Sequence, residues 1–143
     1  MSLVTVHRSL FTSVLTAGLD IRTHAPYNNT PMNGFDLAIV DVETTGTSPG
    51  YDRIIEVGVL KIKDGTVVDT YSTLVDPERS IPYHIENLTG ITNKDLSGAP
   101  TFSDIKEQLI QLLEGCVFVA HNVRFDYGFL RNEFGREGID FSA

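Results

Sequence analysis

The chain has 143 residues, a formal net charge of -8 at pH 7 and 41% hydrophobic residues. This length is typical of one domain with a single core, and no apolar run approaches the ~20 residues that a membrane-spanning helix needs. The acidic balance argues against broad binding to duplex phosphates, which depends on clustered Lys and Arg. It leaves open a site in which carboxylates hold divalent cations and so reverse the local charge that a phosphate meets.

Residues 1–34 differ in composition from the rest of the chain. Residues 7–20, HRSLFTSVLTAGLD, permit a short amphipathic helix, and residues 23–34, THAPYNNTPMNG, have the Pro, Asn and Gly content of an exposed linker. Ser and Thr interrupt the apolar positions, so we do not expect a signal peptide. The lack of an acid before Asp20 leaves an organelle-targeting segment open. We expect residues 1–34 to be a tail or linker and residues 35–143 to form the folded domain.

Three strands are predicted at the start of this domain. They are FDLAIVDVE at 35–43, RIIEVGVLKI at 53–62 and TVVDTYSTLVD at 66–76. The dipeptide Asp64-Gly65 is a strong signal for a tight turn between the second and third strands. We therefore predict an antiparallel meander, followed by an irregular stretch at 77–100.

The next predicted element is a helix that begins after Pro100. Thr101 is the expected N-cap, Asp104 stands where it completes a capping box, and Gly115 is expected to end the helix. Its apolar face is made of residues at helical spacing: Phe102, Ile105, Leu109, Leu112 and Leu113.

A strand and a second helix complete the predicted order. Residues 116–120, CVFVA, read as a short buried strand whose Cys116, the only cysteine, is expected to be a buried and unreactive thiol. Residues 125–134 read as a helix, with Val123, Tyr127, Leu130 and Phe134 along one side. Because a helix connects the third and fourth strands, we predict an α/β fold with a mixed sheet.

The first strand ends in two carboxylates, Asp41 and Glu43. Alternate side chains of a strand share a face, so these two lie together about 7 Å apart while Val42 points into the core. Desolvated like charges repel, and a hard cation such as Mg²⁺ or Mn²⁺ relieves that repulsion. The alternative is that both acids are solvated at the strand end or cap the turn that follows.

A second polar segment follows the fourth strand. The strand ends in His121 and Asn122, and the next helix begins with Phe125 and Asp126. Asp126 by itself is explained as an acid that favours a helix N-terminus. If the fourth strand lies beside the first, however, Asp126 joins Asp41 and Glu43, and three carboxylates meet from two distant segments.

These two segments resemble a known family. DVETTG at 41–46 and HNVRFD at 121–126 look like the first and second motifs of the DEDD-type 3′–5′ exonucleases, which include the proofreading (epsilon) subunit of bacterial DNA polymerase III. RIIEVGVLKI, LVDPERSIP, ENLTGIT and APTFSDI lie between or beside them in the order that such domains show. The resemblance spans residues 35–143. It implies a ribonuclease H-like fold and removal of nucleotides from the 3′ end of DNA by a bacterial-type cytoplasmic enzyme, with a polymerase or helicase as a possible partner.

The resemblance also implies roles for individual residues. Two divalent cations, Mg²⁺ or Mn²⁺, would be held by three acids: Asp41 bridging both, Glu43 on one, and Asp126 on the other. Two such ions activate the attacking water and stabilise the leaving oxygen. The residues expected to contact substrate or brace its site are Thr44, Thr45, Gly46, His121, Asn122 and Phe125. For Gly46 the expected reason is the missing Cβ, which lets the nucleotide come close.

Three assignments stay open on sequence alone. His121 contacts substrate or is a structural imidazole, and residues 86–92 line the nucleotide groove or form a tight surface turn. Glu56 stands in the second strand, and only an unknown strand register would bring it to the active face. We expect it to be structural.

The family pattern includes a third motif, a histidine base and a fourth metal-binding aspartate five positions later, which the 17 residues after Asp126 do not contain. We therefore expect the last strand and helix of the fold to be missing from this sequence, and weak or no activity of this stretch alone. Two alternatives remain: an RNA-directed exonuclease similar to ribonuclease T or oligoribonuclease, and a non-catalytic module of the same fold that binds nucleic acid or a protein partner.

Overall fold

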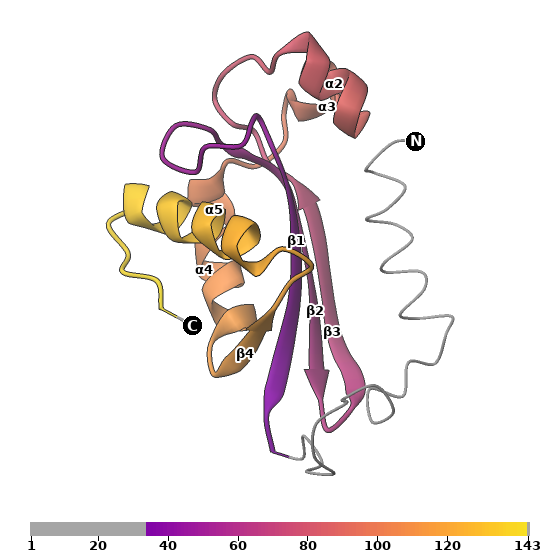
Figure 1. The fold of residues 1–143 in the computed structure, drawn as a ribbon, viewed down its shortest axis with the longest axis vertical. Helices are drawn as coiled ribbons and strands as arrows, with labels where there is room; N and C mark the ends of the chain where they lie inside the picture. Colours follow the sequence, from indigo (N-terminus) through magenta and orange to yellow (C-terminus); the bar gives the residue numbers. More distant parts are fainter. Residues whose placement is uncertain (1–33, 143) are drawn as a thin grey trace.

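A computed structural model of the chain describes residues 34–142, so the predicted tail and short helix within residues 1–33 lie outside the described residues. Its sheet has four strands, β1 (Asp36–Thr44), β2 (Ile54–Lys63), β3 (Thr66–Leu74) and β4 (Cys116–Val119), in the order β3-β2-β1-β4. The first three form the predicted antiparallel meander, and β4 pairs parallel to β1. The predicted mixed sheet is confirmed (Figure 1).

Local sequence explains the meander. Asp64 and Gly65 both have positive φ, 50° and 77°, which is the conformation that a two-residue hairpin turn requires. Along β1, Ala38, Val40 and Val42 alternate into the main core. The intervening residues, Asp41 and Glu43 among them, belong to the other face of the sheet.

Two helices cover one face of this sheet (Figure 1). They are α4 (Phe102–Leu113) and α5 (Val123–Arg136). The capping box of Thr101 and Asp104 is present, and all five predicted apolar residues of α4 are buried. The predicted face of α5 is partly wrong. Val123 is 48% exposed because it stands in the first turn, while Phe129, which we had not placed on that face, is fully buried.

The stretch predicted to be irregular contains two short helices, α2 (Tyr83–Thr89) and α3 (Asn93–Leu96). Gly90 takes a left-handed conformation after α2, and Thr92 and Asp95 form a capping box at α3. Both signals are visible in the sequence. The helices bury a small core of their own, made of Ile55, Ile81, Ile85, Ile91 and Leu96.

Strand β4 is less buried than predicted. Cys116 is buried, as expected, but Val117 and Val119 are 44% and 36% exposed. β4 is an edge strand of the sheet, so its alternate side chains do not all reach the core. None of the helices in residues 34–142 is long and apolar enough to cross a membrane.

Candidate active site

The last residues of β1 bring two acids to the candidate site. Asp41 is half-buried and Glu43 is 9% exposed, while Val42 between them packs in the core as predicted. The pairing of β1 with β2 becomes irregular between Glu43 and Thr44. The strand ends one residue after the second acid, at Thr44, and the loop that follows borders the same pocket.

Asp126 reaches this place from the first turn of α5. Because β4 runs parallel to β1, the chain that follows β4 emerges at the same end of the sheet as Asp41 and Glu43. The backbone N–H of Val42 donates to Oδ1 of Asp126 over 3.1 Å, a contact between residues 84 positions apart. The predicted meeting of the two segments therefore occurs.

The electrostatic setting of Asp126 is unfavourable for a charged carboxylate. Its side chain is 4% exposed, and no Lys or Arg of the described chain forms an ion pair with it. Burial raises the pKa of Asp126 to about 6, and the negative charge of Asp41 adds to the effect, against a smaller lowering by the Val42 N–H. A cation in this pocket would stabilise the ionised form.

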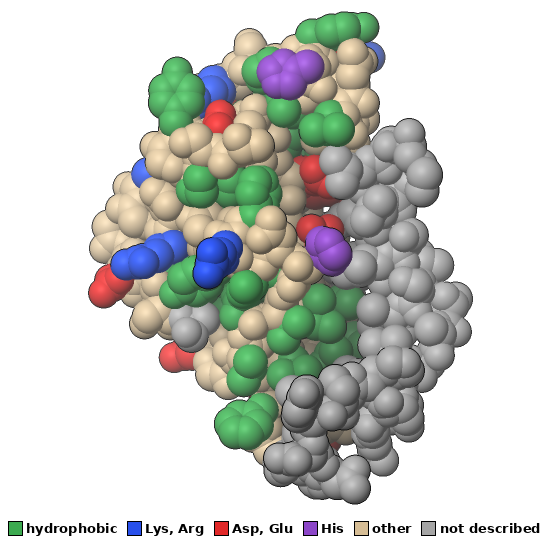
Figure 2. All heavy atoms as spheres, viewed as in Figure 1, with side chains coloured by type: hydrophobic (Ala, Val, Ile, Leu, Met, Phe, Trp, Pro, Cys, Tyr) green, Lys and Arg blue, Asp and Glu red, His purple; other side chains and the backbone are tan. Residues whose placement is uncertain are grey.

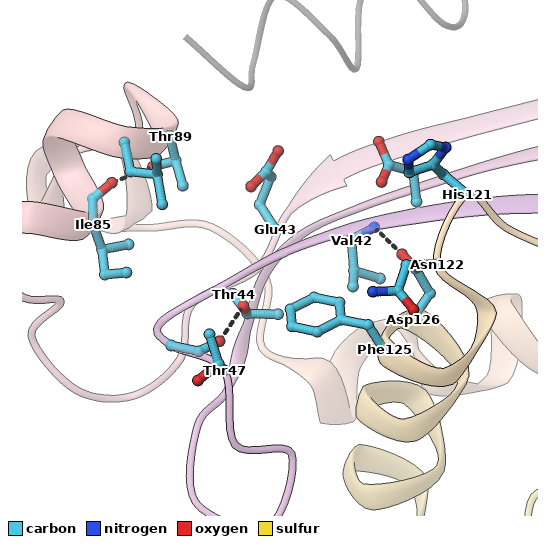
Figure 3. Close-up of a pocket in the computed structure, with 13 residues that line it drawn as sticks. Val42, Glu43, Thr44, Thr47, Ile85, Thr89, His121, Asn122, Phe125 and Asp126 are labelled. Carbon is cyan, nitrogen blue, oxygen red and sulfur yellow. Dashed lines mark hydrogen bonds between the residues drawn. The ribbon is translucent and has the colours of Figure 1, made fainter.

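A pocket of about 470 Å³ joins the predicted residues. It is lined by eight of the nine: Asp41, Glu43, Thr44, Gly46, His121, Asn122, Phe125 and Asp126. Figure 3 shows the carboxylate of Glu43 turned away from that of Asp126. Within residues 34–142, no three His, Cys, Asp or Glu side chains are close enough to form a metal-binding group. The three acids share a pocket without converging on one point.

The donor set nevertheless fits a hard divalent cation. Three carboxylates supply only oxygen ligands, which Mg²⁺ and Mn²⁺ prefer. The negative charge of Asp41 contributes to the raised pKa of the buried Asp126, so the pocket brings these two acids close enough to repel each other. The acids among the residues that line the pocket are Asp41, Glu43 and Asp126.

The loop after β1 has an internal scaffold. Thr45 does not line the pocket: its hydroxyl donates to Asp52 Oδ1 over 3.2 Å and accepts from the backbone N–H of Arg53 over 3.0 Å. A Cβ on Gly46 would overlap the carboxylate of Asp52. The missing Cβ of Gly46 therefore leaves room for the Asp52 carboxylate, while the close approach of a nucleotide stays a prediction. In contrast, Thr44 lines the pocket and donates to the carbonyl of Gly46 over 2.6 Å.

The opposite wall of the pocket comes from α2, which sequence reasoning had reached only in part. Leu88 and Thr89 of α2 fall within the predicted 86–92 segment. Ile85 of the same helix and Thr47 of the loop after β1 were not predicted from the sequence. Leu88 is 52% exposed, so an apolar side chain stands at the mouth of the pocket. On the α5 side, the ring of Phe125 packs on Phe129, with centroids 4.8 Å apart.

The strand register also places Glu56. It pairs directly with Glu43 across β1 and β2, so its side chain lies on the same face of the sheet as Glu43. Sequence alone did not establish this register. The structural role that we expected for Glu56 stays a prediction.

Comparison with known proteins agrees with this geometry. Residues 38–140 match the family model of the RNase T type, described as exonuclease. The chain belongs to this exonuclease family. It is 44% identical over 96 residues to a PolC-type DNA polymerase III of Clostridium perfringens, a stretch that covers 67% of this chain and 7% of that protein. It is also 41% identical over 109 residues to the 3′-5′ exonuclease DinG of Bacillus subtilis, covering 76% and 12%.

Solved structures confirm the fold of this exonuclease domain. Exonuclease I without ligand superposes with a TM-score of 0.67 and 22% identity, covering 74% of this chain and 26% of that one. An E. coli exonuclease I bound to a dT13 oligonucleotide gives the same TM-score and identity, with 24% of that chain covered. The sheet and helices therefore form the ribonuclease H-like fold that the sequence predicts. The chain spans only a small part of each of these relatives.

Proposed function

We propose that residues 35–143 remove nucleotides from the 3′ end of single-stranded DNA by hydrolysis that depends on two divalent cations, Mg²⁺ or Mn²⁺. The observation that carries this proposal is the pocket in which Asp126 of α5 joins Asp41 and Glu43 of β1. A buried carboxylate that faces another acid and has no basic partner among the described residues is costly to a fold. A bound cation supplies the missing positive charge.

In this proposal Asp41, Glu43 and Asp126 hold the cations, which supply an activated water and charge stabilisation at the leaving oxygen. The backbone of Val42 fixes Asp126, and the Asp52 scaffold fixes the loop that carries Thr44 and Gly46.

The remaining pocket residues position the terminal nucleotide. Thr44, Gly46, His121 and Asn122 border the acids, while Phe125 and the α2 side chains supply apolar surface for a base. Thr45, which we had expected to contact substrate, acts here through the loop scaffold.

The preference for DNA, the cellular setting and the partner rest on relatives. Proteins named as a DNA polymerase and as a 3′-5′ exonuclease, both from bacteria, contain segments more than 40% identical to this chain. The exonuclease I structures include complexes with single-stranded DNA and a zinc-bound form. These names support work on DNA in a polymerase context, and a bacterial cytoplasm is the setting that we propose for it.

The test uses a 5′-labelled single-stranded DNA and its RNA counterpart, each incubated with the chain and Mn²⁺. Because residues 127–143 contain no histidine to act as the base of the third motif, we expect a slow ladder that shortens from the 3′ end of the DNA and disappears with EDTA or in Asp41→Ala. Asp140→Asn is a matched control, because it removes an exposed acid outside the pocket. Faster degradation of the RNA would favour the RNA-directed alternative.

A second readout separates binding from hydrolysis. Mn²⁺ should raise the melting temperature of the chain, and Asp41→Ala should abolish most of that increase. Intact substrates together with no metal-dependent stabilisation would contradict the proposal and favour a non-catalytic module.

A further inference from the structure

The solvent-facing side of α5 is unusual in a chain of net charge -8. Nine Lys and Arg residues lie within residues 34–142, and three of them, Arg124, Arg131 and Arg136, are on this one helix. All three are exposed. The two acids of the helix, Asp126 and Glu133, are both buried on its opposite side. The exposed charge of α5 is therefore entirely positive.

Helical spacing makes this charge continuous. Arg124, Gly128, Arg131 and Gly135 follow one another at intervals of four, three and four residues, so they form one stripe along the helix. Arg124 and Arg131 are seven residues apart, a rise of about 10 Å. A Cβ on Gly135, beyond Arg131, would meet nothing within 4 Å, whereas a Cβ on Gly128, between the two arginines, would lie 3.6 Å from the side chain of Pro49. The stripe is therefore open at its far end and is bordered by Pro49 between the arginines.

The stripe begins at the candidate active site and ends at a second hollow. Asn122, Phe125 and Asp126 line the first pocket, while Arg131, Asn132, Gly135 and Arg136 line a hollow of about 520 Å³ with Gly50. Figure 2 shows basic side chains along α5 on the same face as the acidic and histidine side chains at its N-terminal end.

Arg136, at the far end of α5, is held by the fold and is not part of the stripe. It donates to the carbonyls of Pro49 and Asp52 over 3.0 and 3.3 Å and lies 3.4 Å from Glu133 Oε1, which fixes its position beside the hollow. Glu137, the acid directly after α5, is occupied by Lys106 over 2.7 Å. The positive field of the stripe is therefore not cancelled by that neighbour.

We propose that the Arg124–Arg131 stripe binds the phosphate backbone of the single strand whose 3′ end occupies the active-site pocket. This inference rests on the proposed function and adds where the rest of the strand runs. Guanidinium groups bind phosphates with two parallel hydrogen bonds, and both arginines of the stripe are exposed to solvent, where a backbone can reach them. In this arrangement the acids of the pocket hold the cations at the phosphate that reacts. The arginines of α5 contact the phosphates of the next nucleotides along the strand directly.

The test measures binding of a fluorescent dT oligonucleotide by anisotropy in EDTA, at several salt concentrations. The variant is R124Q/R131Q. The matched control, K61Q/K63Q, removes the same charge from the end of β2 that is far from the pocket. We expect the variant to bind about tenfold more weakly at low salt, and the slope of log affinity against log salt to fall by about 1.4, or 0.7 for each lost phosphate contact. The control should keep the slope.

Melting temperatures of both variants should stay close to that of the parent chain, because Arg124, Arg131 and Lys63 are exposed, Lys61 is only half-buried, and substitutions outside the core change stability little. Hydrolysis of a thymidine 5′-monophosphate nitrophenyl ester, which lacks the following phosphates, should be unchanged in R124Q/R131Q. Unchanged oligonucleotide affinity and salt slope in R124Q/R131Q would overturn the proposal that the stripe binds the strand and would leave the proposed function standing. Loss of binding to an acidic peptide, with oligonucleotide binding intact, would also overturn it and assign the stripe to a protein partner.

Discussion

Helix α5 carries two buried carboxylates, seven residues apart, whose surroundings are opposite. Glu133 is 1% exposed, and its Oε1 accepts from Arg53 Nε over 2.8 Å and from the backbone N–H of Ile54 over 3.1 Å. Arg136 lies 3.4 Å from the same oxygen. Asp126 is 4% exposed but accepts from the backbone of Val42 and faces Asp41.

The contrast is the one expected between a structural acid, Glu133, and the acid that we propose to be functional, Asp126. The fold neutralises Glu133 with two arginines, and it thereby ties α5 to the start of β2. It leaves Asp126 without a basic partner among the described residues, next to another acid. Because a buried unpaired charge destabilises a protein, the cation that we propose would stabilise Asp126 by supplying the opposite charge. Each of the following predictions tests one side of this comparison.

The largest expected effect is on catalysis. Asp126→Asn keeps the size of the side chain and the oxygen that accepts from Val42, but it removes the charge that would hold a cation. We expect hydrolysis of single-stranded DNA to fall about 10³-fold or more, with no loss of melting temperature in EDTA. A variant as active as the parent chain would remove Asp126 from the site.

Glu133→Gln, in contrast to Asp126→Asn, should lower the stability of the chain. It leaves Arg53 and Arg136 beside a neutral amide, and breaking a buried ion pair typically costs about 3 to 5 kcal/mol. We expect the free energy of unfolding in urea to fall by about that amount. Glu107→Gln, an exposed acid on α4, is the control and should change it by less than about 0.5 kcal/mol. Equal stability of the two variants would mean that the Glu133 network is not structural.

The pH dependence of the free energy of unfolding distinguishes Asp126 from Glu133 in proteins that remain folded. A pKa of about 6 in the folded state, above the ordinary 3.8, means that the folded chain binds the Asp126 proton more tightly than the unfolded chain. Its contribution is therefore most favourable below about pH 4 and is lost as the pH rises to about 6, by at most about 3 kcal/mol. The difference in unfolding free energy between the parent chain and Asp126→Asn, measured in EDTA from pH 4 to 7, isolates this change.

Adding Mn²⁺ at pH 7 should recover much of that loss in the parent chain and not in Asp126→Asn. A pH-independent difference between the two proteins would contradict the electrostatic contrast between Asp126 and Glu133.

Much of this arrangement could be predicted from the sequence because it depends on local patterns. Alternation and the Asp64-Gly65 turn predicted the meander, and the Thr101 capping box predicted the start of α4. The pairing of the Asp41 and Asp126 segments followed from one topological assumption, that the fourth strand lies beside the first. The structure confirms that assumption.

What could not be predicted depends on contacts between distant residues. The register that pairs Glu56 with Glu43 would change face with a slip of one residue. The turn of Thr45 away from the pocket depends on Asp52. Glu133 was not singled out, although it stands four residues after Phe129 and so shares its buried face, a signal that the sequence does contain.

The smallest expected effect links the two regions. Arg53, held by Glu133, also donates its backbone N–H to Thr45, so the loop that borders the active site is attached to the structural network. Gly46→Ala would drive a methyl group into the Asp52 carboxylate and should destabilise the chain by about 1 to 3 kcal/mol. Gly50→Ala is the matched control in the same loop, because a Cβ there meets nothing within 4 Å.

In the Asp52→Ala background, Gly46→Ala should cost at least about 1 kcal/mol less, since the group that it overlaps is gone. Urea unfolding of the four proteins in this cycle gives the coupling energy. Additive effects would mean that the Asp52 carboxylate is not what excludes a side chain at Gly46. A clear coupling would mean that Asp52 occupies the space beside Gly46, and that the same carboxylate, which also accepts from Thr45, holds the loop beside Asp41 and Glu43.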